Sequence, residues 1–231
     1  MSAGKVQVIG MVVDVELYNS RIRQVKDLSL TAATLEEKLK AFGYSGEGRL
    51  RDEQVENLQL PPIALIFYSY LYETDTIPSD TSLVEEYFKQ PYFEYVPDGK
   101  VEVDYGGSKS VVSMDGVIGR VLRTYPSLVR DLHFYLLVKE SGQFEAVRYS
   151  FKADYYDKID LKVQYGGQWY NIGLMLGSKR SLGYRFKKIF RHKPVDTIDM
   201  ELNKSDADMV GDFMLYTPNH INKLLHIIKS K

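Results

Sequence analysis

The sequence predicts a mixed α/β or α+β protein built in two parts, of which the C-terminal part is the more regular. Two observations carry this prediction. In residues 116–231, a segment with apolar residues at three- and four-residue spacing is followed by segments in which apolar and polar residues alternate. A glycine pair and a Thr-Pro step mark a turn and a helix start among these segments. The expected order is helix, three strands, helix and strand.

Turn and capping residues set the expected bounds of these elements. Pro126 suits the first turn of a helix that carries Leu128 and Leu132 on one face. Gly166 and Gly167 suit a two-residue hairpin turn between two strands. The expected elements are a helix over 126–139, strands over 144–150, 158–165 and 168–176, a helical segment over 181–190, a strand over 196–202, and a final helix over 217–229.

Residues 1–115 change element type without a regular order and predict a smaller mixed module for recognition or oligomerisation. Glycines and serines between residues 106 and 116 suggest the linker to the C-terminal part. The apolar run Ile63–Tyr72 is expected to be buried as a strand or as a helix, and its periodicity does not decide between them. The other expected elements are a strand over 5–17, helices over 35–42, 51–58 and 82–90, and a hairpin of 92–96 with 100–104.

Composition excludes several classes of site. The 231 residues include no cysteine, which rules out disulfides, thiolate zinc sites and cysteine nucleophiles. The formal net charge is −1, so no global charge draws the chain to nucleic acid or to a membrane. The first residues lack the apolar segment of a signal peptide, and the longest apolar run is too short to span a bilayer. We expect a cytoplasmic protein with no membrane partner.

Positive charge is concentrated in one segment, Lys179–Lys193. It holds seven of the 30 lysines and arginines and no acid, which leaves 23 basic residues against 31 acidic ones in the chain. A solvated helix face normally includes acidic partners, whereas an unmixed basic cluster can hold a phosphate backbone. The segment therefore predicts contact with nucleic acid, above all DNA, through Arg180, Arg185, Lys187, Lys188, Arg191 and Lys193.

Asp160 is the first candidate for chemistry, because it lies within an expected strand among apolar neighbours. Its hairpin partner ends near Lys179, and paired strands lie about 5 Å apart, so one hairpin can bring a carboxylate and a cation together. Metal-dependent hydrolysis of a phosphodiester uses such groups. Asp131, beside the apolar stripe of the preceding helix, can complete a metal site. The charge pattern alone also fits two aspartates on solvated surfaces.

This arrangement resembles the PD-(D/E)xK nuclease superfamily, including its transposon-end endonuclease (TnsA-like) branch. The resemblance covers residues 116–231 and implies the α-β-β-β-α-β core of restriction-endonuclease-like proteins. It implies a metal-dependent endonuclease of DNA restriction, defence or mobile-element processing, with Mg²⁺ or Mn²⁺ as cofactor. By the resemblance, Asp160 is the metal-binding aspartate, Lys179 the motif lysine and Asp131 the helical acid. The second motif carboxylate is missing, because Gly177 stands in its position.

Gly177 leaves two other functions open. The chain can be a catalytically inactive nuclease fold that binds nucleic acid within a larger complex or as a homodimer. It can also be an interaction scaffold whose basic segment binds an acidic protein. Salt-dependent nucleic-acid binding without cleavage indicates the first, and no binding at low salt indicates the second.

Overall fold

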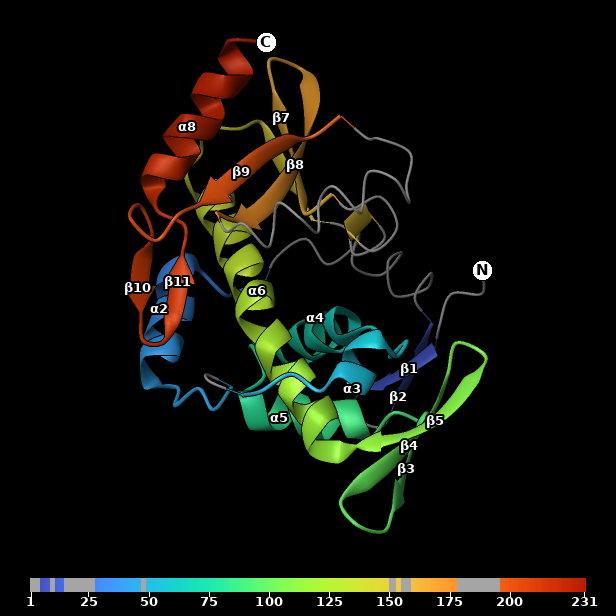
Figure 1. Cartoon of the computed structure of the whole chain (residues 1–231). Coiled ribbons are helices and arrows are strands. Elements are labelled where there is room, and N and C mark those ends of the chain that lie inside the picture. The colour runs from blue at the N-terminus through green and yellow to red at the C-terminus, as the bar shows by residue number, and fades with distance from the viewer. Residues whose placement is uncertain are drawn as a thin grey trace. The chain divides into compact units, whose positions relative to one another are not determined.

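The computed structural model describes residues 5–8, 11–14, 28–46, 49–149, 153–154, 159–177 and 196–231. It divides into two compact units, the first of Met1–Leu30 with Phe42–Leu128 and the second of Thr31–Ala41 with Val129–Lys231. This division differs from the expected boundary between residues 115 and 116. It falls within the helix α6, Met114–Glu140, which contributes residues to both units (Figure 1).

The first unit contains a β-hairpin, several helices and a three-stranded antiparallel sheet of order β3-β4-β5. The apolar run that the sequence left undecided is a helix, α4. Residues 65–69 and Leu71 within it are buried, as expected of a helix that is apolar on most sides. No helix in the described ranges is both long and apolar enough to cross a membrane. The elements are β1 (Lys5–Val8), β2 (Met11–Asp14), α3 (Glu53–Asn57), α4 (Ile63–Thr74), α5 (Asp80–Phe88), β3 (Phe93–Val96), β4 (Lys100–Tyr105) and β5 (Ser108–Ser113).

The expected linker over residues 106–116 is wrong. Gly106 and Gly107 form the turn between β4 and β5, with φ angles of 67° and 81°. Both angles are positive, as a two-residue hairpin turn of this kind requires, and glycine adopts them without strain. Helix α6 begins at Met114, directly after β5. The glycine pair therefore marks a hairpin and not a boundary between domains.

Pro126 lies inside α6 and not in its first turn, which corrects the expected start of this helix. A proline has no N–H for the carbonyl four residues earlier, which is that of Leu122. The hydroxyl of Tyr44 donates to the Leu122 carbonyl at 2.7 Å. This hydrogen bond replaces the missing donor, so the helix continues through the proline.

The second unit is built around a four-stranded sheet of order β6-β7-β8-β9. Neighbours are antiparallel from β6 to β8, and β9 lies parallel to β8. The turn between β7 and β8 is the predicted glycine pair, with φ angles of 59° at Gly166 and 76° at Gly167. The elements are α2 (Ala32–Ala41), β6 (Ala146–Arg148), β7 (Leu161–Tyr165), β8 (Gln168–Leu176), β9 (Ile198–Leu202), β10 (Asp208–Val210), β11 (Phe213–Leu215) and α8 (Pro218–Lys229).

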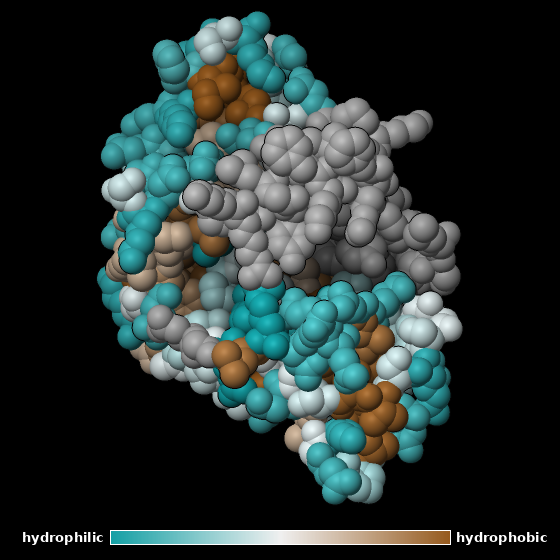
Figure 2. Space-filling model, viewed as in Figure 1, coloured by the Kyte–Doolittle hydropathy of each residue, from teal (hydrophilic) through white to brown (hydrophobic). Residues whose placement is uncertain are grey.

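One face of this sheet is apolar and forms the core of the unit. Because side chains alternate along a strand, every second residue of β7, β8 and β9 points to this face. Figure 1 shows α6 and α8 beside the sheet, and both contribute to the core. Hydrophilic residues dominate the visible surface around α8 (Figure 2). The buried core residues are Phe134, Val138, Leu161, Val163, Ile172, Ile198, Met200, Leu202, Tyr216, Ile221, Leu224 and Ile228.

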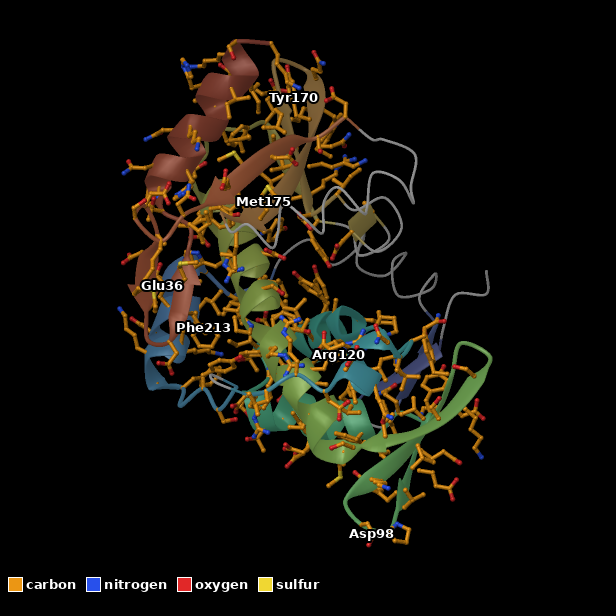
Figure 3. The ribbon with its side chains drawn as sticks, viewed as in Figure 1. Glu36, Asp98, Arg120, Tyr170, Met175 and Phe213 are labelled. Carbon is orange, nitrogen blue, oxygen red and sulfur yellow. The ribbon has the colours of Figure 1, made fainter. Side chains whose placement is uncertain are left out.

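Helix α2 joins the second unit through contacts with α6 and with the β10-β11 hairpin. Glu36 on α2 lies 2.9 Å from Nε2 of the buried His133 on α6, and the N–H of Ala32 donates to the Glu140 carboxylate at 2.9 Å. In Figure 3, Glu36 lies on the side of α2 near Phe213 of β11. These contacts bring residues 31–41 into the C-terminal unit.

We expect His133 to make the second unit sensitive to acid. Burial lowers the pKa of His133 below its ordinary value of 6.5, although Glu36 acts in the opposite direction. The pKa of His133 is therefore lower in the folded state than in the unfolded chain, so the unfolded chain binds the proton at a higher pH. The contribution of neutral His133 to the free energy of unfolding is present above about pH 6.5 and is lost as the pH falls below it. Urea unfolding of His133→Gln between pH 7.5 and 5 should show a smaller loss of stability than the wild type.

The matched control for this prediction is His226→Gln, because His226 is exposed on α8. Its stability should follow the pH as the wild type does. Equal pH dependence of all three proteins would contradict a role for His133.

Candidate functional site

Asp160 lies directly before β7 and not within it, which corrects the expected strand over 158–165, and it is held beside β8. Its N–H donates to the carbonyl of Ile172 at 3.0 Å, and its Oδ2 accepts the N–H of Leu174 at 2.5 Å. The residue is half-buried. A hydrogen bond to a charged acceptor is stronger than one between neutral groups, so the hairpin fixes both the backbone and the carboxylate of Asp160.

Gly173 of β8 lies between two carboxylates. It is paired with Asp199 of the parallel strand β9. A Cβ at Gly173 would lie 2.8 Å from Oδ1 of Asp199 and 4.0 Å from Oδ2 of Asp160. The carboxylates of Asp160, just before β7, and of Asp199 in β9 thus both lie beside Gly173, which has no side chain to fill the space.

Gly177, the position at which the resemblance would place a second carboxylate, is also covered from β9. Its N–H donates to the carbonyl of Leu202 at 2.8 Å. A Cβ at Gly177 would lie 2.6 Å from Oε1 of Glu201 and would meet Oδ1 of Asn203. An acidic side chain introduced here would have to displace these two groups. The carboxylate at this place therefore comes from the neighbouring strand.

Asp131 and Asp160 lie within electrostatic range of one buried hydroxyl, that of Tyr216. This hydroxyl accepts the N–H of Met175 at 3.1 Å and donates to the carbonyl of Met200 at 2.9 Å. Burial raises the pKa of Tyr216 above its ordinary range, and the negative charges of Asp131 and Asp160 raise it further. Both negative charges thus act on the hydroxyl that is bonded to β8 at Met175, which is labelled in Figure 3.

Lys179, which was expected to be a motif lysine, and the rest of the basic segment follow Gly177 in the sequence. They lie outside the described residues, so their contribution to the site rests on the sequence. These residues are Lys179, Arg180, Arg185, Lys187, Lys188, Arg191 and Lys193.

The carboxylates of Asp160 and Asp131 are of the chemical type that Mg²⁺ and Mn²⁺ prefer. Within the described ranges, however, no three acidic or histidine side chains are grouped closely enough to hold an ion. Mg²⁺ usually keeps several waters and binds through one or two carboxylates together with substrate phosphates. The donor set fits Mg²⁺ when a phosphate and water complete its coordination.

The sequence prediction missed Asp199 and Glu201 as members of this region. Their signal was the alternation within Ile198–Leu202, which places both acids on the face opposite the apolar core. That alternation does not identify the neighbouring strand. Only the parallel pairing of β9 with β8 brings the two acids to Gly173 and Gly177.

Comparisons with protein-family models, with curated proteins and with solved structures found no match to this chain. Support for a function therefore comes from the geometry of the second unit and from the sequence.

Proposed function

We propose that the second unit is a metal-dependent endonuclease domain with a restriction-endonuclease-like core. The observation that carries the proposal is the position of Asp160, which is fixed beside β8 by two hydrogen bonds to that strand. In the sequence, β8 leads directly into the basic segment Lys179–Lys193. One hairpin thus connects a carboxylate that can bind a metal with cations that can bind phosphate.

The strand order of the second unit supports the proposed core. Three antiparallel strands are followed by a fourth that is parallel to the third. A parallel neighbour requires a crossover connection, and residues 177–197 provide one between β8 and β9. Helix α6 precedes the sheet in the chain and α8 follows it. The helix expected within the crossover, at residues 181–190, lies outside the described residues.

In the proposed site, Asp160 and Asp131 bind the ion, and Lys179 contacts the attacking water or the phosphate. Bound Mg²⁺ or Mn²⁺ polarises a phosphoryl oxygen and lowers the pKa of water. The N–H of Leu174 orients the Asp160 carboxylate. The basic segment holds the phosphate backbone of DNA in place. The protein thereby binds and orients the scissile phosphodiester.

A second candidate function is nucleic-acid binding without cleavage, within a larger complex or as a homodimer. Gly177 favours it, because this residue offers no carboxylate. The lack of a three-ligand group among the described residues favours it as well. An acidic protein as the partner of the basic segment is a third outcome that the same experiment distinguishes.

The proposal is tested with the full chain, supercoiled plasmid and a fluorescent duplex. Cleavage is measured with Mg²⁺, with Mn²⁺ and with EDTA, and binding is measured by fluorescence anisotropy over a range of salt concentrations. Cleavage that requires the ion supports the endonuclease. Salt-dependent binding without cleavage contradicts the endonuclease and supports nucleic-acid binding alone. If the protein binds no duplex even at low salt, both of these functions are excluded.

Charge reversal in the basic segment should weaken nucleic-acid binding without changing its sequence preference. In Lys187→Glu/Lys188→Glu, two cations are lost, and phosphate contacts carry no base information. The slope of log affinity against log salt concentration should fall by about one for each lost contact. Anisotropy titrations with two unrelated duplexes measure both effects.

The control for charge reversal is Lys204→Glu/Lys223→Glu, which changes the net charge equally at two exposed positions outside the segment. Its affinity should remain close to that of the wild type. Equal weakening by both double variants would indicate an effect of net charge and would remove the basic segment from the interface.

A further inference from the structure

Arg130 of α6 is a buried cation with few partners. The residue is 8% exposed. Its Nε donates to the carbonyl of Met214 at 3.0 Å. Neither Nη group forms a hydrogen bond or an ion pair with a residue that the structure describes. Because a guanidinium carries five N–H donors, four of them are left over.

Such a group is costly unless water or a ligand satisfies its donors. Removing a charge from water costs several kcal/mol, which is recovered only when good partners satisfy the charge and its hydrogen bonds. Burial lowers the pKa of Arg130, while Asp131 and Tyr216 oppose that change, and arginine stays protonated in proteins. The carbonyl of Met214 satisfies one donor. The Nη atoms are not among the fully buried side-chain atoms that lack a partner, so they are accessible to water or to an anion.

The surroundings of Arg130 place it in the candidate site. Its charge acts on the hydroxyl of Tyr216, on which Asp131 and Asp160 also act. That hydroxyl is hydrogen-bonded to the backbones of β8 and β9 at Met175 and Met200. Arg130 is itself bonded to Met214, two residues before Tyr216 in the chain, so the cation lies at the end of β11 that leads to this hydroxyl.

We propose that the Nη groups of Arg130 bind the oxygens of a phosphate group, and that this phosphate belongs to the nucleic-acid backbone in the site. The planar guanidinium offers two parallel N–H donors that match two phosphate oxygens. Arg130 is thus a phosphate-binding residue in addition to the basic segment. The assignment of the phosphate to nucleic acid rests on the proposed function, whereas phosphate recognition by Arg130 is tested separately.

The first test uses inorganic phosphate and the full chain. Thermal unfolding is followed in phosphate and in sodium chloride of equal ionic strength. Phosphate should raise the unfolding midpoint of the wild type by about 2–4 °C, because it binds the folded state. The rise should be smaller in Arg130→Lys, absent in Arg130→Gln, and larger in Asp131→Asn, in which a neighbouring negative charge is removed.

The matched control is Arg120→Lys. Arg120 is also a partly buried arginine of α6, but its Nη1 donates to the carbonyls of Val55 and Leu58 in the first unit (Figure 3). Its loss should lower the unfolding midpoint without changing the phosphate-induced rise. An equal rise in the wild type and Arg130→Gln, or no rise in the wild type, overturns the proposal.

The second test identifies the source of the phosphate. Affinity for a DNA duplex should fall about tenfold in Arg130→Lys and about 100-fold in Arg130→Gln, since each tenfold step is the loss of one charged hydrogen bond. DNA binding by the wild type that is unchanged in both variants overturns the assignment to nucleic acid. A phosphate-induced rise that depends on Arg130, in a protein that binds no DNA, supports a small-anion site and contradicts the proposed function alone.

Discussion

Asp160→Asn is expected to reduce metal-dependent plasmid cleavage about 1,000-fold or more. A metal ion acting on a phosphoryl oxygen contributes several kcal/mol to transition-state stabilisation, and each 1.36 kcal/mol is a factor of about ten in rate. The asparagine amide is neutral and binds the ion poorly. Its carbonyl oxygen can still accept the N–H of Leu174, so the hairpin should keep its structure.

The control for Asp160→Asn is Asp196→Asn. Asp196 is exposed just before β9, and its carboxylate lies 3.6 Å from Nζ of Lys231. An exposed pair of this kind contributes little to stability. The control should cleave plasmid at the wild-type rate, and circular dichroism should confirm that both variants are folded. Cleavage that survives Asp160→Asn would show that the active site lies elsewhere.

Phe134→Ala is expected to destabilise the second unit by about 3–5 kcal/mol, which is the usual cost of removing a buried phenylalanine ring. Phe134 is fully buried, and its ring centroid lies 4.5 Å from that of Tyr216. The cavity would remove support from the ring whose hydroxyl is bonded to both β8 and β9. Urea unfolding followed by tyrosine fluorescence measures the loss.

Met209→Ala is the control for this variant, because Met209 is 58% exposed on β10. A surface substitution of this kind usually changes stability by less than about 0.5 kcal/mol. Equal destabilisation by the two substitutions would contradict the assignment of Phe134 to the core.

The local elements of the second unit follow from the sequence because their signals are local. Gly166 and Gly167 supply the positive φ angles of a hairpin turn, and alternation on either side defines β7 and β8. Thr217 and His220 form a capping box, and α8 begins at Pro218, directly after Thr217. The expected place of Asp160 beside β8 came from the same alternation.

The sequence did not predict what depends on residues distant in the chain. The continuation of α6 through Pro126 depends on a hydrogen bond from Tyr44. The place of residues 31–41 in the second unit depends on contacts such as that of Glu36 with His133. Neither contact leaves a signal in the local pattern, because each joins residues that are far apart in the sequence.

The sequence by itself determined the alternating strands, the turns, the concentration of basic residues and the absence of a carboxylate at Gly177. The tertiary structure alone decided which polar groups share one region. Parallel pairing of β8 with β9 brought Glu201 beside Gly177, and packing of α6 brought Arg130 to the carbonyl of Met214. The physical reason is that a strand's alternation fixes the face of each side chain, whereas its neighbour is chosen by packing across the whole unit.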